Sequence, residues 1–172
     1  KCVCRPGYYG AFCEWVEKTE LEVELGRFFG TLPDKDWDLL FGKDNYSDLF
    51  IRIVAYRSTG SPVTKETHVI DEVNKSGANG INIGRWLFFG IDKWVKIAVY
   101  AMDSDLTRSE VIYSQTFNFG QMALPGQFGD RLPANLVIRE NGNYRGQVEM
   151  NIKQWYCHAW QTDDLPKCPK YL

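Results

Sequence analysis

Hydrophobic and polar residues alternate along most of this chain with a period of two, the period of a strand that is buried on one face. Residues 20–25 read Glu-Leu-Glu-Val-Glu-Leu, and the segment 146–154 places Val148, Met150 and Ile152 on one side. We predict eight strands, at 20–25, 49–56, 66–73, 83–89, 94–100, 111–119, 135–139 and 146–154. No segment of the sequence shows a sustained helical period.

Turn-forming residues separate the predicted strands. Gly and Pro gather at 60–62, 77–80 and 125–126. Asn141-Gly142, between the last two strands, is the strongest short signal for a β-hairpin. Short strands with such turns predict an all-β fold, an eight-stranded antiparallel β-sandwich. The alternation alone does not distinguish this sandwich from a β-barrel.

Composition narrows the class of function. The formal net charge of the 172 residues is −2, so no broad basic field is present to hold nucleic acid. No run of about eighteen apolar residues occurs, so the sequence predicts no bilayer-spanning helix. Aromatic residues make up 15% of the chain, which suits β-structure or a contact surface.

Motifs of enzymatic catalysis are missing from the sequence. The chain has two histidines, His68 and His158, and contains no Gly-x-Ser-x-Gly, phosphate-loop or zinc signature. We therefore expect both histidines to be structural and the protein not to be an enzyme.

Three cysteines stand close together near the N-terminus. One residue separates Cys2 from Cys4 and eight separate Cys4 from Cys13, with glycines and tyrosines between them. Residues 1–15 resemble the C-terminal half of an EGF-like module. The resemblance implies a Cys4–Cys13 disulfide and an upstream partner for Cys2, so we expect the chain to begin inside a module of a longer protein whose upstream modules are missing here. A zinc knuckle is the alternative, but no further His or Cys follows at zinc spacing.

The other two cysteines and two glycosylation sequons bear on the cellular compartment of the protein. Cys157 and Cys168 lie near the C-terminus, and we predict that they pair, closing a tail at 157–172 behind a sandwich domain at 19–156. Asn45 and Asn74 stand in sequons for glycosylation. Disulfides persist only in oxidising compartments, so we expect a secreted or extracellular protein.

Carboxylates cluster in two predicted loops beside long apolar strands. Asp44 and Asp48 precede the strand at 49–56, whereas Asp103 and Asp105 follow the strand at 94–100. Calcium takes about six to eight oxygen ligands, which loops can supply where they converge at one end of a sandwich. The four aspartates are therefore candidate Ca²⁺ ligands, and solvated loops that hold no ion are the alternative.

This order of aspartates and strands resembles a C2 domain over residues 21–153. The resemblance implies a sandwich that docks on lipid surfaces, with Ca²⁺ as a cofactor where the acidic loops bind it. One position departs from the C2 pattern. Two aspartates separated by one residue should end the strand at 94–100, but Ala101 stands at the first position and only Asp103 remains. The calcium site is therefore either shifted, with Asp105 as the substitute, or lost.

Two families show this kind of arrangement. The order of EGF-like half-module, C2-like domain and cysteine pair resembles the C-terminal region of perforin-like pore-forming proteins, which implies a targeting part whose pore-forming machinery lies upstream. The tryptophan-rich segments at 86–89, 94–100 and 155–157 also resemble the C2-like N-terminal domain of Notch ligands, which binds lipid and receptor. In Notch ligands the EGF modules follow the C2 domain, whereas here the EGF-like sequence comes first.

Bulky apolar residues in predicted loops are candidates for membrane insertion. They are Trp37, Leu39, Leu40, Phe41 and Leu106. Tryptophan favours the interface between acyl chains and headgroups, and burying one such side chain contributes roughly 1.5–3 kcal/mol. The alternative is that residues 37–41 pack beneath the sandwich as core.

Two classes of function follow. The first is attachment to a phospholipid membrane surface through the loops near Asp48, Asn79 and Asp103. The second is recognition of a receptor protein or a glycan by an aromatic sheet face. The residues predicted for that face are Trp86, Phe88, Trp94 and Trp155.

Overall fold

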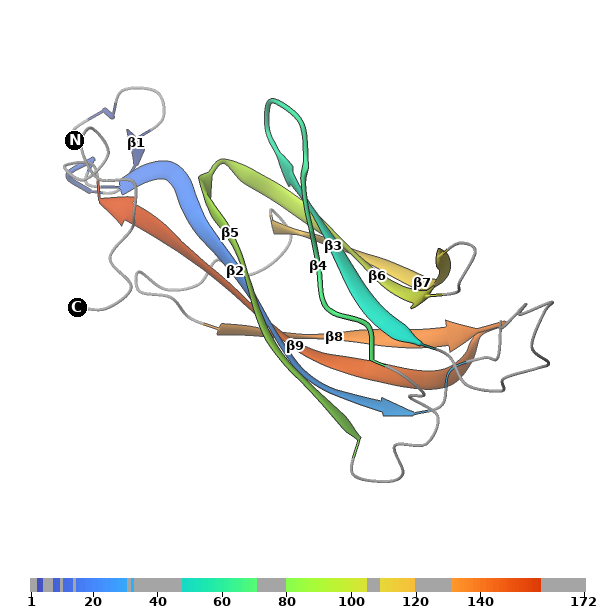
Figure 1. Ribbon diagram of the computed structural model, residues 1–172. Helices are drawn as coiled ribbons and strands as arrows, with labels where there is room; N and C mark the ends of the chain where they lie inside the picture. Colours follow the sequence, from blue (N-terminus) through green and yellow to red (C-terminus); the bar gives the residue numbers. More distant parts are fainter. Residues whose placement is uncertain are drawn as a thin grey trace, which may run out of the picture.

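The computed structural model describes residues 3–4, 8–9, 11–13, 15–30, 32, 48–70, 80–104, 109–119 and 131–158. Nine strands occur in this part of the chain (Figure 1). They are β1 (Tyr8–Tyr9), β2 (Trp15–Gly30), β3 (Leu49–Arg57), β4 (Val63–Glu66), β5 (Ile81–Asp92), β6 (Trp94–Ser104), β7 (Ser109–Asn118), β8 (Arg131–Glu140) and β9 (Asn143–His158). None of the described segments forms a helix with the length and hydropathy that crossing a bilayer requires.

The strands form two antiparallel sheets. Sheet A has the order β1-β2-β9-β8, with β5 also paired to β2, and sheet B has the order β4-β3-β6-β7. Lys93 alone links β5 to β6, so the chain passes from sheet A to sheet B within one residue. The predicted antiparallel sandwich is therefore confirmed. The β-barrel alternative is wrong, because the described strands pair within two separate sheets.

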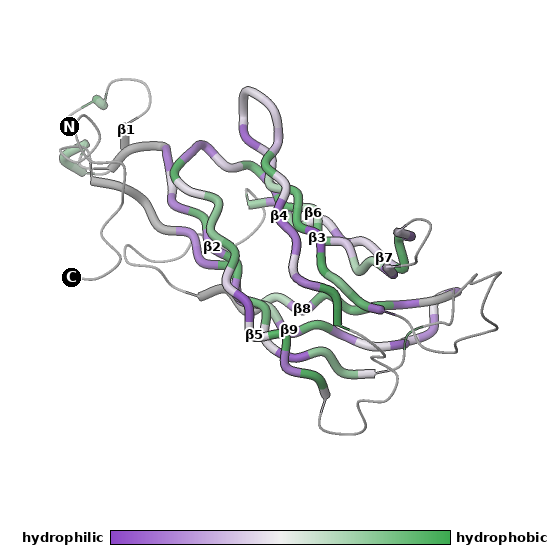
Figure 2. Tube along the Cα trace, in the orientation of Figure 1, coloured by the Kyte–Doolittle hydropathy of each residue, from purple (hydrophilic) through white to green (hydrophobic). Residues whose placement is uncertain are grey.

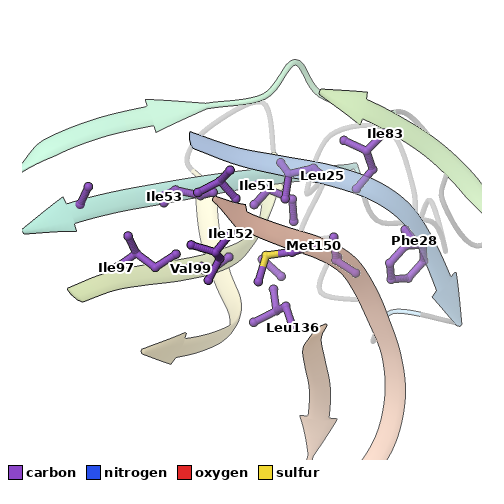
Figure 3. Packing of buried hydrophobic residues seen from close by; sticks show 14 of the residues in the cluster. Leu25, Phe28, Ile51, Ile53, Ile83, Ile97, Val99, Leu136, Met150 and Ile152 are labelled. Carbon is purple, nitrogen blue, oxygen red and sulfur yellow. The ribbon is translucent and has the colours of Figure 1, made fainter. Parts of the chain in front are cut away.

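The core lies between the two sheets and follows the alternation of the sequence. Figure 2 shows hydrophobic and hydrophilic residues alternating along β2. Leu21, Val23 and Leu25 are fully buried, and Glu20 and Glu22, which alternate with them, are also buried, at 7% and 3% exposure. Figure 3 shows residues of both sheets meeting in this core: Leu25, Phe28, Ile83, Leu136, Met150 and Ile152 from sheet A, with Ile51, Ile53, Ile97 and Val99 from sheet B. Each sheet thus buries one face against the other.

The hairpin predicted at Asn141-Gly142 joins β8 to β9. Both residues have positive φ, 50° at Asn141 and 83° at Gly142. Two successive left-handed residues are what a tight hairpin between twisted strands requires, and Asn followed by Gly supplies them at least cost. Glu140 and Asn143 form the last pair of the ladder.

One predicted strand is misplaced. The segment 66–73 was expected to form a strand, but β4 ends at Glu66 and Ile70 forms only an isolated bridge with Leu49. The Thr67 side chain explains the ending, because its hydroxyl oxygen accepts the Ile51 N–H at 3.0 Å and so replaces a backbone acceptor of the ladder. Residues 71–73 lie outside the described part of the chain.

The N-terminal disulfide implied by the EGF resemblance is present between Cys4 and Cys13. The short strand β1 pairs with the beginning of β2, with Tyr8 opposite Val16. Cys2 and Cys168 lie outside the described residues, and only the backbone of Cys157 is described. The EGF half-module, the second disulfide and the three domain boundaries therefore stay predictions.

Candidate functional site at the Asp48 end

Different strand termini lie at the two ends of the sandwich (Figure 1). At one end β2 finishes at Gly30, β3 begins at Leu49, and β6 finishes at Ser104. We call this the Asp48 end. At the other, the Arg57 end, β3 finishes at Arg57 and β5 turns into β6 at Trp94. The predicted functional loops near Asp48, Asn79 and Asp103 all adjoin described residues of the Asp48 end, among them Ile70, Ile81 and Ser104.

Asp48 and Asp103 meet at this end, although 55 residues separate them in sequence. The Asp48 N–H donates to Asp103 Oδ1 at 2.9 Å, and the Ser104 N–H donates to the Asp48 carbonyl at 3.0 Å. The pairing of β3 with β6 produces this contact, because it places Leu49 opposite Asp103. The two acidic segments are therefore joined at one end of the sandwich.

The two carboxylates differ in exposure. The Asp103 side chain is fully buried, whereas Asp48 is half-buried. Ala101, which stands where the C2 pattern has its first aspartate, is fully buried in the core opposite Ile51 and Tyr113. The position that departs from the pattern is therefore a packing position in this protein.

A complete metal site is not found among the described residues. No group of three or more His, Cys, Asp or Glu side chains in that part of the chain is arranged to hold a metal ion. Asp44 and Asp105 lie outside it, so the predicted set of four aspartates stays a prediction. Two carboxylates, one of them buried, fall well short of the roughly six to eight oxygens that calcium takes.

The candidate insertion residues also lie outside the described part of the chain. They are Trp37, Leu39, Leu40, Phe41 and Leu106. The sequon residues Asn45 and Asn74 also lie outside the described residues. Their flanks are nevertheless fixed. Leu32, just after β2, is 5% exposed and packs in the core, and Asp48 is bonded to Asp103. The predicted insertion loop therefore starts and finishes at anchored residues of the same end.

The aromatic face predicted from sequence is partly correct. Trp86 and Phe88 lie on the outer face of sheet A, opposite Glu24 and Glu22, and are 40% and 46% exposed. Trp94 was predicted to join them, which is wrong. It is 6% exposed and belongs to the core, because on β6 the outward position falls to Val95. Only the backbone of Trp155 is described.

A polar network beside these aromatics was missed by the sequence analysis. Lys153 Nζ lies 3.7 Å from Glu22 Oε1 and 4.1 Å from the centroid of the Trp86 ring. Asn151 Nδ2 donates to Glu24 Oε2 at 3.3 Å. The alternation along β2 and β9 already indicated this network, because a period of two places the glutamates of β2 and the polar residues of β9 on the same outer face of sheet A. The register of the strands was needed to pair them.

The histidines occupy unrelated positions. His68 is exposed in the loop that follows β4, where its Nδ1 accepts a hydrogen bond from Arg85 Nε at 3.2 Å. His158 is the last residue of β9, and only its backbone is described. The expectation that this protein is not an enzyme therefore stays a prediction.

Comparison with known proteins shows the fold. No family model and no curated protein sequence matches the chain. A solved structure of human GIVD cytosolic phospholipase A2 with methyl gamma-linolenyl fluorophosphonate matches with a TM-score of 0.56 and 13% identity, over 89% of this chain and 18% of that one. A second structure of that phospholipase, with the same inhibitor and terbium chloride, gives a TM-score of 0.55 and 12% identity over 83% and 18%.

A C2 domain protein from Ramazzottius varieornatus matches less well, with a TM-score of 0.47 and 16% identity over 80% of this chain and 88% of its own. The fold of this chain is C2-like, as its two antiparallel sheets indicate. The chain spans about 18% of the length of the phospholipase, and at these identities the likeness concerns the fold alone.

Proposed function

We propose that this chain is a non-enzymatic C2-like module that attaches its parent protein to a phospholipid membrane surface through the Asp48 end. The observation that carries the proposal is the 2.9 Å hydrogen bond from the Asp48 N–H to Asp103 Oδ1. This bond joins Asp48, which follows the predicted insertion loop, to β6, which precedes the second acidic loop. We expect two segments that are held at one end in this way to meet a flat surface together.

Membrane contact would come from the apolar residues of those loops. Trp37, Leu39, Leu40 and Phe41 follow closely in sequence, and the loop that holds them is anchored by Leu32 and Asp48. Each large side chain that enters the interface contributes roughly 1.5–3 kcal/mol. Two or three of them supply useful affinity for a surface, since each 1.4 kcal/mol is about tenfold in affinity.

Calcium does not fit the described residues well, so we assign it no step. Asp103 Oδ1 already accepts the Asp48 N–H, and Ala101 has no side-chain oxygen to offer. Asp44 and Asp105 are the remaining candidates for ligands. Terbium is a direct probe of any such site, because Tb³⁺ prefers oxygen ligands as Ca²⁺ does, and one of the phospholipase structures contains terbium chloride.

The proposal extends to the parent protein. The Cys4–Cys13 disulfide supports an extracellular or secreted location, since disulfides persist in oxidising compartments. Together with the EGF-like cysteine spacing before the sandwich, it supports the role of targeting part of a perforin-like pore-forming protein. This role predicts that the chain binds membranes without permeabilising them.

Co-sedimentation with liposomes tests the proposed function. We expect the 172-residue chain to sediment with phosphatidylcholine vesicles or with vesicles that also contain phosphatidylserine, in chelator or in millimolar calcium. Trp37→Ala should weaken binding about tenfold, the loss of one interfacial side chain. Trp86→Ala is the matched control, because this tryptophan is exposed on the sheet face and not at a predicted loop. Protein that stays in the supernatant with both lipids in both buffers contradicts the proposal.

A second candidate function is recognition of a glycan or receptor protein by the outer face of sheet A. Trp86 and Phe88 are both exposed there, and the buried ion pair of Lys153 with Glu22 lies beside Trp86. A sugar ring stacks on an exposed aromatic side chain of this kind. A glycan array tests this function, with loss of signal expected in Trp86→Ala and Phe88→Ala and retention in Trp37→Ala.

A further inference from the structure

We propose that Asp103 is a positioning residue that holds the Asp48 end together without a cation, so that lipid binding at this end needs no calcium. The second half of this proposal rests on the proposed function, whereas the first half is independent of it. It assigns to an aspartate of the acidic loops a role that the C2 resemblance does not imply.

Geometry is the first support. Asp103 lies near the end of β6, opposite Leu49, the first residue of β3. Its carboxylate accepts the N–H of Asp48, and the next residue, Ser104, donates its N–H to the Asp48 carbonyl. Both backbone groups of Asp48 are therefore bonded to β6. This closes the β3–β6 ladder at its last position and fixes the direction in which the chain enters β3.

Burial is the second support. The Asp103 side chain has no exposed surface. A buried carboxylate is tolerated when hydrogen bonds replace its lost hydration, and a bond to a backbone N–H is among the stronger of these. The contact with Asp48 supplies such a bond to one of the two carboxylate oxygens, Oδ1.

The third support is the residue two positions earlier. In the C2 pattern two aspartates, separated by one residue, share the ion. Here Ala101 fills the first position and packs in the core with no exposed surface. Ala101 places a methyl group where the C2 pattern has the neighbouring aspartate. Asp103 therefore keeps the role that does not depend on an ion, which is to accept the backbone N–H of Asp48.

The opposite end offers a matched control. Asp92 also accepts a backbone N–H, that of Lys93, at 2.7 Å, and it lies at the turn between β5 and β6. Asp92→Ala therefore removes a backbone N–H contact, together with the ion pair to Arg57, from the end that carries none of the predicted lipid-binding loops. Asp103→Asn is the second control, because its amide oxygen can still accept the Asp48 N–H while the negative charge is lost.

Thermal unfolding in chelator and in millimolar calcium tests the role of Asp103. We expect Asp103→Ala to lower the Tm in chelator by roughly 3–8 °C, because the partly buried Asp48 N–H loses its acceptor. Asp103→Asn should stay within about 2 °C of the unaltered chain, and calcium should leave the Tm of all variants unchanged. The proposal is overturned if Asp103→Ala melts no lower than the unaltered chain in chelator. It is also overturned if calcium raises the Tm of the unaltered chain and Asp103→Asn abolishes that rise.

Liposome binding tests the consequence for function. In chelator, the unaltered chain, Asp103→Asn and Asp92→Ala should sediment equally with vesicles, and Asp103→Ala should bind several-fold more weakly because the Asp48 N–H is no longer held by β6. Binding that appears only with calcium overturns calcium independence while leaving membrane attachment intact. Binding in neither buffer contradicts the proposed function instead, and the unfolding experiment then still decides the role of Asp103.

Discussion

The two ends of this sandwich are closed by different chemistry. At the Arg57 end, the contacts are made by side chains. Trp94 packs edge-on against Phe89 with ring centroids 6.2 Å apart. The Nε1–H of Trp94 donates to the Gly90 carbonyl at 3.0 Å. Arg57 lies over the Trp94 ring at 5.6 Å and pairs with Asp92 at 3.4 Å. At the Asp48 end the described contacts include backbone hydrogen bonds, one buried carboxylate and the core packing of Leu32.

This difference suggests how the molecule divides its tasks. An end sealed by a large aromatic side chain gains stability from packing and leaves little for a ligand to contact. An end held by backbone bonds to strand termini is defined in position yet leaves the adjoining loops available for a partner. We therefore expect substitutions at the Arg57 end to change stability without changing lipid binding, and the following experiments test that separation.

Trp94→Ala should have the largest effect. The side chain is 6% exposed and contacts the core, so its removal should lower the free energy of unfolding by about 3–5 kcal/mol. Urea unfolding followed by circular dichroism measures the change. Trp94→Phe, which keeps most of the packing and loses the bond to Gly90, should cost clearly less. Folded Trp94→Phe that no longer binds vesicles would show that the two ends are coupled.

Gly146→Ala should have the next largest effect, at the side of the sandwich that leads to the Asp48 end. A Cβ on Gly146 would lie 2.5 Å from the Phe29 carbonyl oxygen, so the β2–β9 ladder would have to shift where Gly146 faces Gly30. We expect a loss of about 2–3 kcal/mol in the free energy of unfolding.

Gly60→Ala is the control for that substitution. Gly60 stands between β3 and β4 at the Arg57 end, with a φ of 89° and nothing within 4 Å of the position that an added methyl group would take. Only the backbone strain of a non-glycine residue applies there, about 1 kcal/mol. Equal losses for the two alanine variants in urea unfolding would refute the close contact between β2 and β9.

Arg57→Met should have the smallest effect. The ion pair with Asp92 is about one-third exposed on both partners, and such pairs together with a cation–π contact contribute about 1 kcal/mol. The difference from the unaltered chain in urea unfolding should shrink as salt concentration rises, since salt screens the ion pair. A loss that does not depend on salt would assign the effect to packing against Trp94 instead.

Much of the fold was predictable because it depends on local patterns. The alternation in 20–25 and 146–154 identified β2 and β9. Asn141-Gly142 identified the hairpin between β8 and β9, because these two residues tolerate a positive φ. The errors came from contacts between distant residues. The predicted strand at 66–73 failed because the Thr67 hydroxyl takes the Ile51 N–H.

The candidate site was predictable only in part. The sequence pointed to Asp48 and Asp103 as members of acidic segments beside strands, and the structure brings them within hydrogen-bonding distance. It did not indicate that one of these carboxylates would be buried. Trp94 was misjudged for the same reason, since an aromatic residue at the beginning of a strand gives no sign of which face it will occupy.

By itself, the sequence determined most of the strands and the tight turn at Asn141-Gly142, because backbone preference and a period of two act over a few neighbouring residues. Only the tertiary structure decided what the acidic segments do, because the register of β3 against β6 places the Asp48 N–H on a carboxylate that lies 55 residues away. Burial and hydrogen bonding depend on such long-range neighbours, and they separate a carboxylate that holds the chain from one that is exposed to solvent.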